Sequence, residues 1–369
     1  MRSSSAVRRW TALLSLLLSS CSSATPSSAP PDDSSTPSGA PLSWSTVYDD
    51  ITLGGAFLSV WEKNAEVFAV GGGLGNGSPT LVVRGAEGRW SLLSPGGSET
   101  LWWVFGQSPS AVWMVGEQGR IVLWNGSAFI EHRFPTTATL FGVWASVEGE
   151  AWAVGGSPTM GTGAANDVVL HWDGASWQRE PLPGPARGET LYKVWGRSKD
   201  DVFAVGENGA LWHRRAGVWE DERNAIGASE SLTSVTGCAD EIFAAGGQTV
   251  AELHADSWLH LLLPDTARVV GVACGMTPEN LLLVGWGSLK LFRASNGWRD
   301  DTFVEPYVDL HGSWMTADGE AWAVGGDYVG EGVPGRARRG TVARFGHGNP
   351  FGPFPTTRPD WRATPEAPP

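Results

Sequence analysis

Three acidic clusters contain the residue types that acid–base chemistry needs, and they recur along the chain. They are Glu148-Gly149-Glu150, Asp200-Asp201 and Asp318-Gly319-Glu320. Two carboxyl groups held a few ångströms apart can act as acid and as base or nucleophile, as in glycoside hydrolysis. Each cluster, however, follows the same strand-like phrase in its own copy of a repeat, where a polar turn is expected. We therefore interpret these carboxylates as turn residues and not as catalytic pairs.

Histidines are the next residues that could support chemistry. His171, His213 and His254 each lie near the end of the third strand-like segment of a different repeat. Residues in different repeats at that position are far apart, so they cannot share one metal ion. The chain has no HExxH pair, calcium-binding loop, phosphate-binding loop or GxSxG nucleophile motif. We expect no metal and no cofactor.

One segment is superficially similar to a glycosidase motif. Sialidase-type propellers carry Ser-x-Asp-x-Gly-x-Thr-Trp boxes together with an arginine cluster and a tyrosine nucleophile, and Asp173–Trp177 lacks the leading serine and the threonine. Only four tyrosines are present, and no innermost strand presents clustered arginines. Trp102, in the phrase Leu101–Phe105, is the one additional aromatic residue that could stack on a sugar. We predict that the protein is not an enzyme.

The N-terminus carries an export signal. Arg2, Arg8 and Arg9 precede the short apolar run Trp10–Leu18, which is too short to span a bilayer. The run ends in Leu18-Ser19-Ser20-Cys21, which resembles the lipobox of bacterial lipoproteins. That resemblance implies a signal peptide over residues 1–20 and lipidation of Cys21. An ordinary secretory signal with a coincidental cysteine is the alternative.

The segment after Cys21 has the composition of a tether. Residues 22–41 are almost all Ser, Pro, Ala and Thr, and we expect residues 21–43 to be a disordered spacer. Ser22 follows the cysteine, which in the family rule for Gram-negative lipoproteins favours the outer membrane over the inner one. The sequence thus predicts an exported, lipid-anchored envelope protein that contacts the membrane only through its lipids.

The net charge excludes one class of ligand. It is −13 for the whole chain, and three units more negative once residues 1–20 are removed. Such a protein repels the phosphates of nucleic acids, so we expect no nucleic-acid partner.

A repeat organises the rest of the chain. Its Val-Gly element ends at seven glycines, with successive spacings of 45, 39, 51, 40, 39 and 40 residues: Gly71, Gly116, Gly155, Gly206, Gly246, Gly285 and Gly325. The clearest copy reads as four strands, named a to d here: Leu191–Trp195, Val202–Val205, Ala210–His213 and Val218–Glu220. A period near 40 with four strands per unit is typical of a propeller blade.

The count of blades depends on how the ring closes. The seventh repeat lacks a strand d aromatic, while Leu42–Val47 precedes the first strand a and reads as an unpaired strand d. Pairing the two would remove a free sheet edge. We therefore predict an all-β, seven-bladed propeller of four-stranded antiparallel blades over residues 44–346, closed by the N-terminal strand. Residues 347–369, with seven prolines, are expected to be a tail.

The repeat unit is itself informative. The pattern Val-Trp-Gly-x-Ser-x-x-Asp-Val-Phe-Ala-Val-Gly…Gly-x-Trp resembles propeller repeats of exported lipoproteins of myxobacteria and related bacteria, over about residues 44–346. The resemblance implies a propeller fold and an exported location but little about function. Blades five and six depart from it, with Thr236 and Ala273 where the other blades carry an aromatic residue.

Two cysteines lie in these divergent blades. Cys238 and Cys274 each follow a strand a, and neighbouring inner strands lie side by side around the axis. A disulfide between them would join blades five and six in an exported protein. Two buried free thiols are the alternative.

Long loops predict the ligand face. The b–c loops of blades one, three and seven, at Gly72–Pro79, Ser157–Asp167 and Asp327–Gly340, are longer than the minimal turn of blade four. Insertions on one face of a repeat protein often form its binding surface. The blade-seven loop carries Tyr328, Glu331, Arg336, Arg338 and Arg339, which we interpret as a positive patch. Glycine-rich loops without a ligand are the alternative.

These observations favour a non-catalytic, monomeric binding scaffold. Its ligand would be a protein or a glycan, and a glycan-binding or glycan-cleaving propeller is the alternative function. Exposed coplanar aromatic rings over a cleft, with Trp102 among them, would favour a sugar. A broad face would favour a protein.

Overall fold

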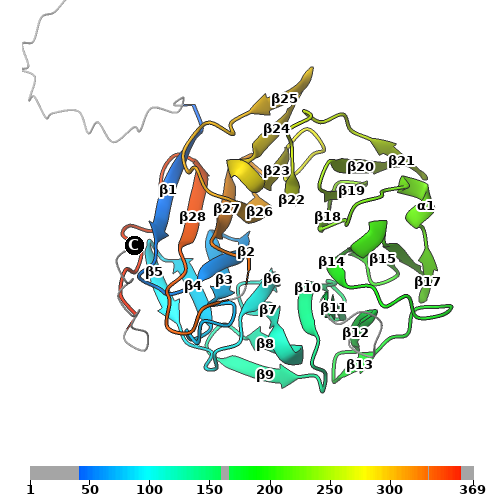
Figure 1. The fold of residues 1–369 in the computed structure, drawn as a ribbon, viewed down its shortest axis with the longest axis horizontal. Helices are drawn as coiled ribbons and strands as arrows, with labels where there is room; N and C mark the ends of the chain where they lie inside the picture. Colours follow the sequence, from blue (N-terminus) through cyan, green and yellow to red (C-terminus); the bar gives the residue numbers. More distant parts are fainter. Residues whose placement is uncertain (1–40, 159–165, 331, 359–369) are drawn as a thin grey trace, which may run out of the picture. The chain divides into compact units, whose positions relative to one another are not determined.

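The computed structural model describes residues 41–158, 166–330 and 332–358. The signal segment, Cys21, most of the expected tether, Glu331 and the last eleven residues lie outside this part of the chain. In the described part, seven four-stranded antiparallel sheets stand around a common axis, with the first strand of each repeat innermost (Figure 1). The predicted seven-bladed propeller is confirmed.

The strands of the first four blades follow one another from the axis outward. Blade one comprises β2 (Ala56–Lys63), β3 (Glu66–Gly72), β4 (Leu81–Ala86) and β5 (Arg89–Leu93). Blade two comprises β6 (Leu101–Ser108), β7 (Ala111–Gly116), β8 (Arg120–Trp124) and β9 (Phe129–Arg133). Blade three comprises β10 (Thr139–Ala145), β11 (Ala151–Gly156), β12 (Val168–Trp172) and β13 (Trp177–Arg179). Blade four comprises β14 (Leu191–Ser198), β15 (Asp201–Gly206), β16 (Leu211–Arg215) and β17 (Val218–Asp221).

The remaining blades follow the same order. Blade five comprises β18 (Ser234–Cys238), β19 (Glu241–Gly246), β20 (Thr249–His254) and β21 (Ser257–His260). Blade six comprises β22 (Val269–Cys274), β23 (Leu281–Gly285), β24 (Lys290–Ala294) and β25 (Gly297–Asp300). Blade seven comprises β26 (Leu310–Met315), β27 (Ala321–Gly326), β28 (Gly340–Gly346) and β1 (Ser43–Asp50). A short helix, α1 (Arg223–Ile226), lies in the connection from blade four to blade five.

The ring closes through the N-terminal strand, as expected. β1 pairs antiparallel with β28, with Trp44 opposite Phe345. Trp44 supplies the strand d aromatic that blade seven lacks, and its ring centroid lies 5.9 Å from that of Phe292 in blade six. Closure therefore joins the two ends of the repeat array through backbone pairing and through a shared hydrophobic cluster.

The last strand ends at Gly346, the expected end of the propeller, but the residues that follow are not a free tail as far as residue 358. Residues 347–358, the C-terminal strap, pack on the outer part of blade one. Phe351 and Phe354 are buried, and the Arg358 guanidinium donates to the carbonyl oxygens of Pro79 and Thr80. The strap also contacts the closing strand, because the Phe354 ring stacks on that of Tyr48 at 4.8 Å. The strap therefore covers the seam between blades seven and one, where Phe351 contacts both Trp90 and Trp322.

Inner strands pack by matching a large residue with a small one in the next blade. The Trp195 ring lies against Gly237, where an added Cβ would come within 2.5 Å of it. Trp61 and Trp144 lie in the same way against Gly106 and Gly196. Glycine is needed in these blades because the neighbouring indole occupies the side-chain volume.

Blades five and six reverse this match. Thr236 and Ala273 replace the aromatic residue, and the facing positions of the following blades carry Cys274 and Met315 instead of glycine. A larger side chain thus stands where the missing indole no longer requires glycine. This accounts for the place of Cys274, whereas Cys238 follows Gly237, the glycine that still faces Trp195.

Candidate functional site

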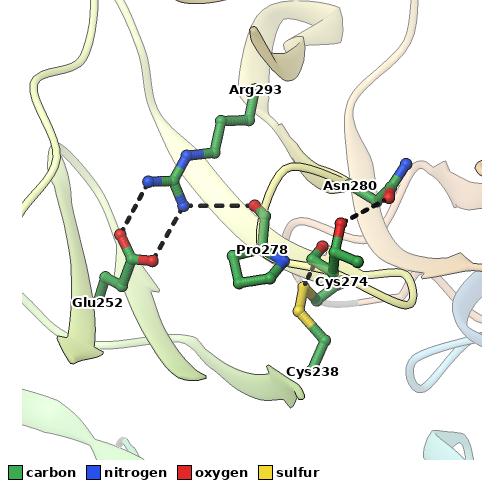
Figure 2. Close-up of a disulfide and its surroundings, with 7 residues drawn as sticks. Cys238, Glu252, Cys274, Pro278, Asn280 and Arg293 are labelled. Carbon is green, nitrogen blue, oxygen red and sulfur yellow. Dashed lines mark hydrogen bonds and ion pairs between the residues drawn. A yellow bond between two sulfur atoms is a disulfide. The ribbon is translucent and has the colours of Figure 1, made fainter. Parts of the chain in front are cut away.

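Cys238 and Cys274 form a disulfide between the ends of β18 and β22, with their Cα atoms 5.7 Å apart (Figure 2). The predicted bridge is confirmed. A second link joins the same two blades farther out, where Arg293 forms a bidentate ion pair with Glu252 at 3.0–3.1 Å. Arg293 also donates to the carbonyl oxygen of Pro278, in the loop that follows Cys274. The bridge therefore belongs to the framework of the blade five–six seam.

One acidic residue at the a–b turn of five blades is paired within its own blade. Each of the five pairs with a basic residue of strand c; the pairs are Glu66–Arg84, Glu150–His171, Asp201–His213, Glu241–His254 and Glu320–Arg344. This repeated interaction accounts for the histidines and for one member of each acidic cluster, while Glu148, Asp200 and Asp318 are exposed turn residues. Their recurrence reflects blade construction.

His213 shows the electrostatics of this pair most clearly. Its imidazole is buried and contacts the Asp201 carboxylate at 2.6 Å and the Glu222 carboxylate at 3.3 Å. Burial disfavours the charged ring, but the two carboxylates outweigh burial and raise the pKa of His213. Within the described residues, no group of three or more His, Cys, Asp or Glu side chains could hold a metal ion.

The long loops of blades one and seven are fastened to each other. The Gly332 N–H donates to the carbonyl oxygen of Leu74 at 2.7 Å, and the Gly335 N–H donates to that of Asn76 at 2.9 Å. The Asn76 amide in turn donates to the Arg336 carbonyl oxygen at 2.8 Å. These two loops therefore form one surface. The blade-three loop is described only at its ends, so the part it was expected to play in the ligand face stays a prediction.

Arg338 is a framework residue. Its side chain is buried, and its guanidinium donates to the carbonyl oxygens of Gly73, Asp327, Val329 and Gly330. Carbonyl oxygens at a loop with no regular pairing need donors, and arginine offers five. Arg338 also lines the cleft beside blade seven, so its place in the ligand face stays a prediction, with its guanidinium directed at the backbone of the loops.

The predicted positive patch is wrong in its charge. Arg336, Arg338 and Arg339 line a cleft of about 740 Å³ beside blade seven. Four aspartates line it with them: Asp49, Asp50, Asp309 and Asp327. Arg339 is paired with Asp49 at 3.0 Å. Three of the aspartates lie outside the loop, in the closing strand and in the connection between blades six and seven, so their convergence could not be deduced from the loop alone.

Trp102 lies at the axis and does not form an exposed platform. Its half-buried ring meets those of Phe141 and His311 edge-on, at 4.8 and 5.7 Å. Its indole nitrogen is buried and has no hydrogen-bond partner among the described residues. Tyr328 is buried too, at 5.0 Å from the His311 ring. The structure brings Trp102 and Tyr328 together around His311, and Tyr328 also lines the cleft that the arginines line.

A buried lysine lies beneath this cluster, and sequence reasoning did not single it out. The Lys193 ammonium donates to the Phe141 carbonyl oxygen at 2.9 Å and lies 4.1 Å from the Trp103 ring centroid. Burial lowers the pKa of Lys193 to about 7. Burial, together with the charge of Lys193, lowers the pKa of His311 to about 3, so this imidazole is neutral and donates to the Leu58 carbonyl oxygen. The signal available in the sequence was the position of Lys193, a charged residue within an innermost strand.

Exposed apolar side chains gather on one sector of the propeller, the face formed by the b–c and d–a loops of blades six and seven. The exposed residues there, with Ile51 at the end of the closing strand, are Trp286, Phe303, Val304, Tyr307, Val329 and Val333. On the same face of blades two to four, the described residues expose no large apolar side chain. An apolar patch of this kind is typical of a protein interaction surface. Sequence reasoning missed it because single apolar residues in loops carry no periodic pattern.

No protein-family model matches the chain, and no curated protein matches it. Among solved structures, the chain is similar to the β-propeller domain of Cps50 (Swd1) from Myceliophteria thermophila, with 14% identity and a TM-score of 0.60 over 82% of this chain and 99% of that one. It is also similar to the extracellular domain of a protein described as a hybrid two component system from B. thetaiotaomicron, with 9% identity and a TM-score of 0.55 over 79% of this chain and 40% of that one. A third similar structure is YCF48 bound to D1 peptide, with 15% identity and a TM-score of 0.47 over 68% of this chain and 92% of that one. The two with TM-scores above 0.5 establish a β-propeller and nothing finer. No helix among the described residues is long and apolar enough to cross a membrane.

Proposed function

We propose that this protein is a non-catalytic, lipid-anchored scaffold of the bacterial cell envelope that binds another protein. Its binding face is the sector of blades six, seven and one that carries the b–c and d–a loops. The observation that carries the proposal is the concentration of exposed apolar side chains around the 740 Å³ cleft of that sector.

A protein ligand is favoured over a glycan by the side chains that line the cleft. Sugars bind on flat, exposed rings, whereas the aromatic residue in the lining of the cleft, Tyr328, is buried, and Trp102 is half-buried with its aromatic neighbours edge-on. The exposed apolar side chains of the lining are aliphatic, namely Ile51, Val329 and Val333, which suit a protein surface. The interlocked loops of blades one and seven support a preformed face, which lowers the entropic cost of binding.

The envelope location rests on the sequence. Leu18–Cys21 resembles a lipobox, and the repeat unit resembles those of exported myxobacterial lipoproteins. Metabolic labelling with an alkyne fatty acid tests the anchor: the wild-type chain should be labelled and Cys21→Ser should not. Equal labelling of the two chains would remove the anchor from the proposal.

Site-specific photo-crosslinking in living cells tests the binding face. A photoreactive residue at Val333, which is 56% exposed at the cleft, should give a discrete protein adduct. The matched control is Val147, which is 84% exposed in the a–b turn of blade three, on the opposite face. Adducts at Val147 alone, or at neither site, would contradict the proposed face.

A further inference from the structure

Two adjoining hollows form one trough on the proposed binding face. The larger hollow, of about 740 Å³, begins at the end of the closing strand, and the smaller, of about 440 Å³, extends to Tyr307. They share the residues Asp309, Gly326, Asp327 and Arg339. We call the combined depression the blade-seven trough. Its continuity past two loops suits an extended chain better than a compact ligand.

The charges that remain available in the trough are negative. Asp309 accepts a hydrogen bond from the Gly287 N–H through one oxygen, and Asp327 accepts one from the Arg339 N–H through one oxygen. The second oxygen of each carboxylate has no hydrogen-bond partner within the described part of the chain. The positive groups are already engaged: Arg339 pairs with Asp49, and Arg338 is directed at backbone carbonyls. Arg336 lines the larger hollow only, so the shared part of the trough attracts a cation.

Apolar side chains flank these carboxylates on both sides. Tyr307 is 63% exposed at one end, and Val329, Val333 and Ile51 are each at least half exposed around the larger hollow. An occupant that satisfies both features must alternate apolar and basic side chains. A glycan without free amino groups has no cationic group, and a free metal ion would leave the apolar rim uncovered.

We propose that the blade-seven trough binds an extended segment of a partner protein, with a lysine or arginine side chain between Asp309 and Asp327 and apolar side chains against Tyr307 and Val329. This inference rests on the proposed function, because it names the partner chemistry of the same face. In this proposal the two aspartates orient the bound segment, and the apolar rim supplies most of the contact area.

A display library of random peptides, selected on the purified full-length protein, tests the inference. The enriched peptides should share a lysine or arginine within two positions of an aromatic or branched apolar residue. Asp309→Asn with Asp327→Asn keeps the acceptor oxygens that hold Gly287 and Arg339 but removes the charge. This variant should bind the enriched peptides about tenfold more weakly, the equivalent of roughly 1.4 kcal/mol.

The matched control is Asp200→Asn with Asp240→Asn, two exposed aspartates in a–b turns on the opposite face. It should bind as the wild type does, and thermal unfolding of both double variants should match that of the wild type. Enriched peptides without a basic residue, no enrichment at all, or unchanged affinity in the Asp309/Asp327 variant would overturn the inference.

Crosslinking from Val333 separates this inference from the proposed function. An adduct that is lost in the Asp309→Asn, Asp327→Asn variant supports both. An adduct that persists in this variant keeps the proposed function and overturns the charge assignment. No adduct in any variant contradicts the proposed function itself.

Discussion

The guanidinium of Arg338 donates a hydrogen bond to the carbonyl oxygen of Gly73 at 3.1 Å, and so joins the long loop of blade seven to that of blade one. The same guanidinium donates to three carbonyl oxygens of its own loop. A loop of this length lacks the backbone pairing of a strand, and one buried side chain replaces it. The shape of the proposed binding face thus depends on a buried side chain that is bonded to the backbone of both loops.

Arg338→Met should therefore destabilise the protein and loosen the face. The substitution removes the donor of the carbonyl oxygens of Asp327, Val329 and Gly330, which are partly buried, while the Gly73 carbonyl oxygen keeps the Asn76 N–H as a donor. The loss should cost roughly 1–3 kcal/mol. Hydrogen–deuterium exchange should rise in both long loops, since the Gly332 and Gly335 N–H groups donate to blade one beside the Arg338–Gly73 contact. Arg89→Met, at an arginine whose side chain is 75% exposed, is the control and should change stability by less than about 0.5 kcal/mol. Equal effects of the two variants would contradict this assignment.

The C-terminal strap should contribute to stability as a core element does. Phe354 is 8% exposed and packs against Tyr48 and Trp90, with ring centroids 4.8 and 4.9 Å apart. Phe354→Ala should therefore lower the free energy of unfolding in urea by roughly 3–5 kcal/mol. Phe303→Ala, at a ring that is 86% exposed, is the matched control and should be near neutral. If the strap contributes nothing to stability, the two variants should have the same urea midpoint of unfolding.

Sequence periodicity was sufficient for the blades but not for these two features. Strands such as Val202–Val205 recur about every 40 residues with a turn at a fixed place, so the strand pattern and the number of repeats both indicate the same propeller. The ring closure follows from the strand d that the seventh repeat lacks. The strap has no partner repeat, and its prolines indicate disorder unless the buried rings are known. From the sequence, Arg338 is expected to be an exposed charge, because arginine is rarely buried without partners. Its partners are backbone carbonyl oxygens that come together only in the folded loop.

The candidate site was predictable in part for the same reason. Loop length drew attention to blades one and seven, whose long loops are hydrogen-bonded to each other in the structure. The sign of the charge was missed because Asp49 and Asp309 belong to other connections and converge on Arg339 only when the ring closes. The disulfide was predictable because Cys238 and Cys274 fall on equivalent ends of adjacent inner strands.

Loss of that disulfide should weaken the ring at the blade five–six seam. The bridge closes a loop with a sequence separation of 36 residues, for which the chain-entropy relation gives roughly 3–4 kcal/mol. The double variant Cys238→Ser, Cys274→Ser should have a free energy of unfolding in guanidinium that is lower by that amount. Reductant should shift the wild type equally and leave the double variant unchanged. If reductant leaves the wild type unchanged as well, the bridge does not stabilise the fold. The Glu252–Arg293 ion pair remains in every case, so the seam should weaken without opening.

The buried amine of Lys193 should make stability rise with pH. Its pKa is 10.5 when exposed and about 7 in the folded protein, because burial disfavours the ammonium. Between these pH values the unfolded chain binds more protons than the folded chain, so stability increases as pH rises from about 7 towards 10.5, by roughly 3–5 kcal/mol. Lys193→Met keeps the volume and removes the titration, at a pH-independent cost of about 1 kcal/mol for the hydrogen bond to Phe141. Unfolding in urea at pH 6.5 and pH 9.5 measures both effects. The variant should be the more stable protein at pH 6.5 and should lose that advantage at pH 9.5. A constant difference between wild type and variant at the two pH values would show that the Lys193 pKa is not lowered in the fold.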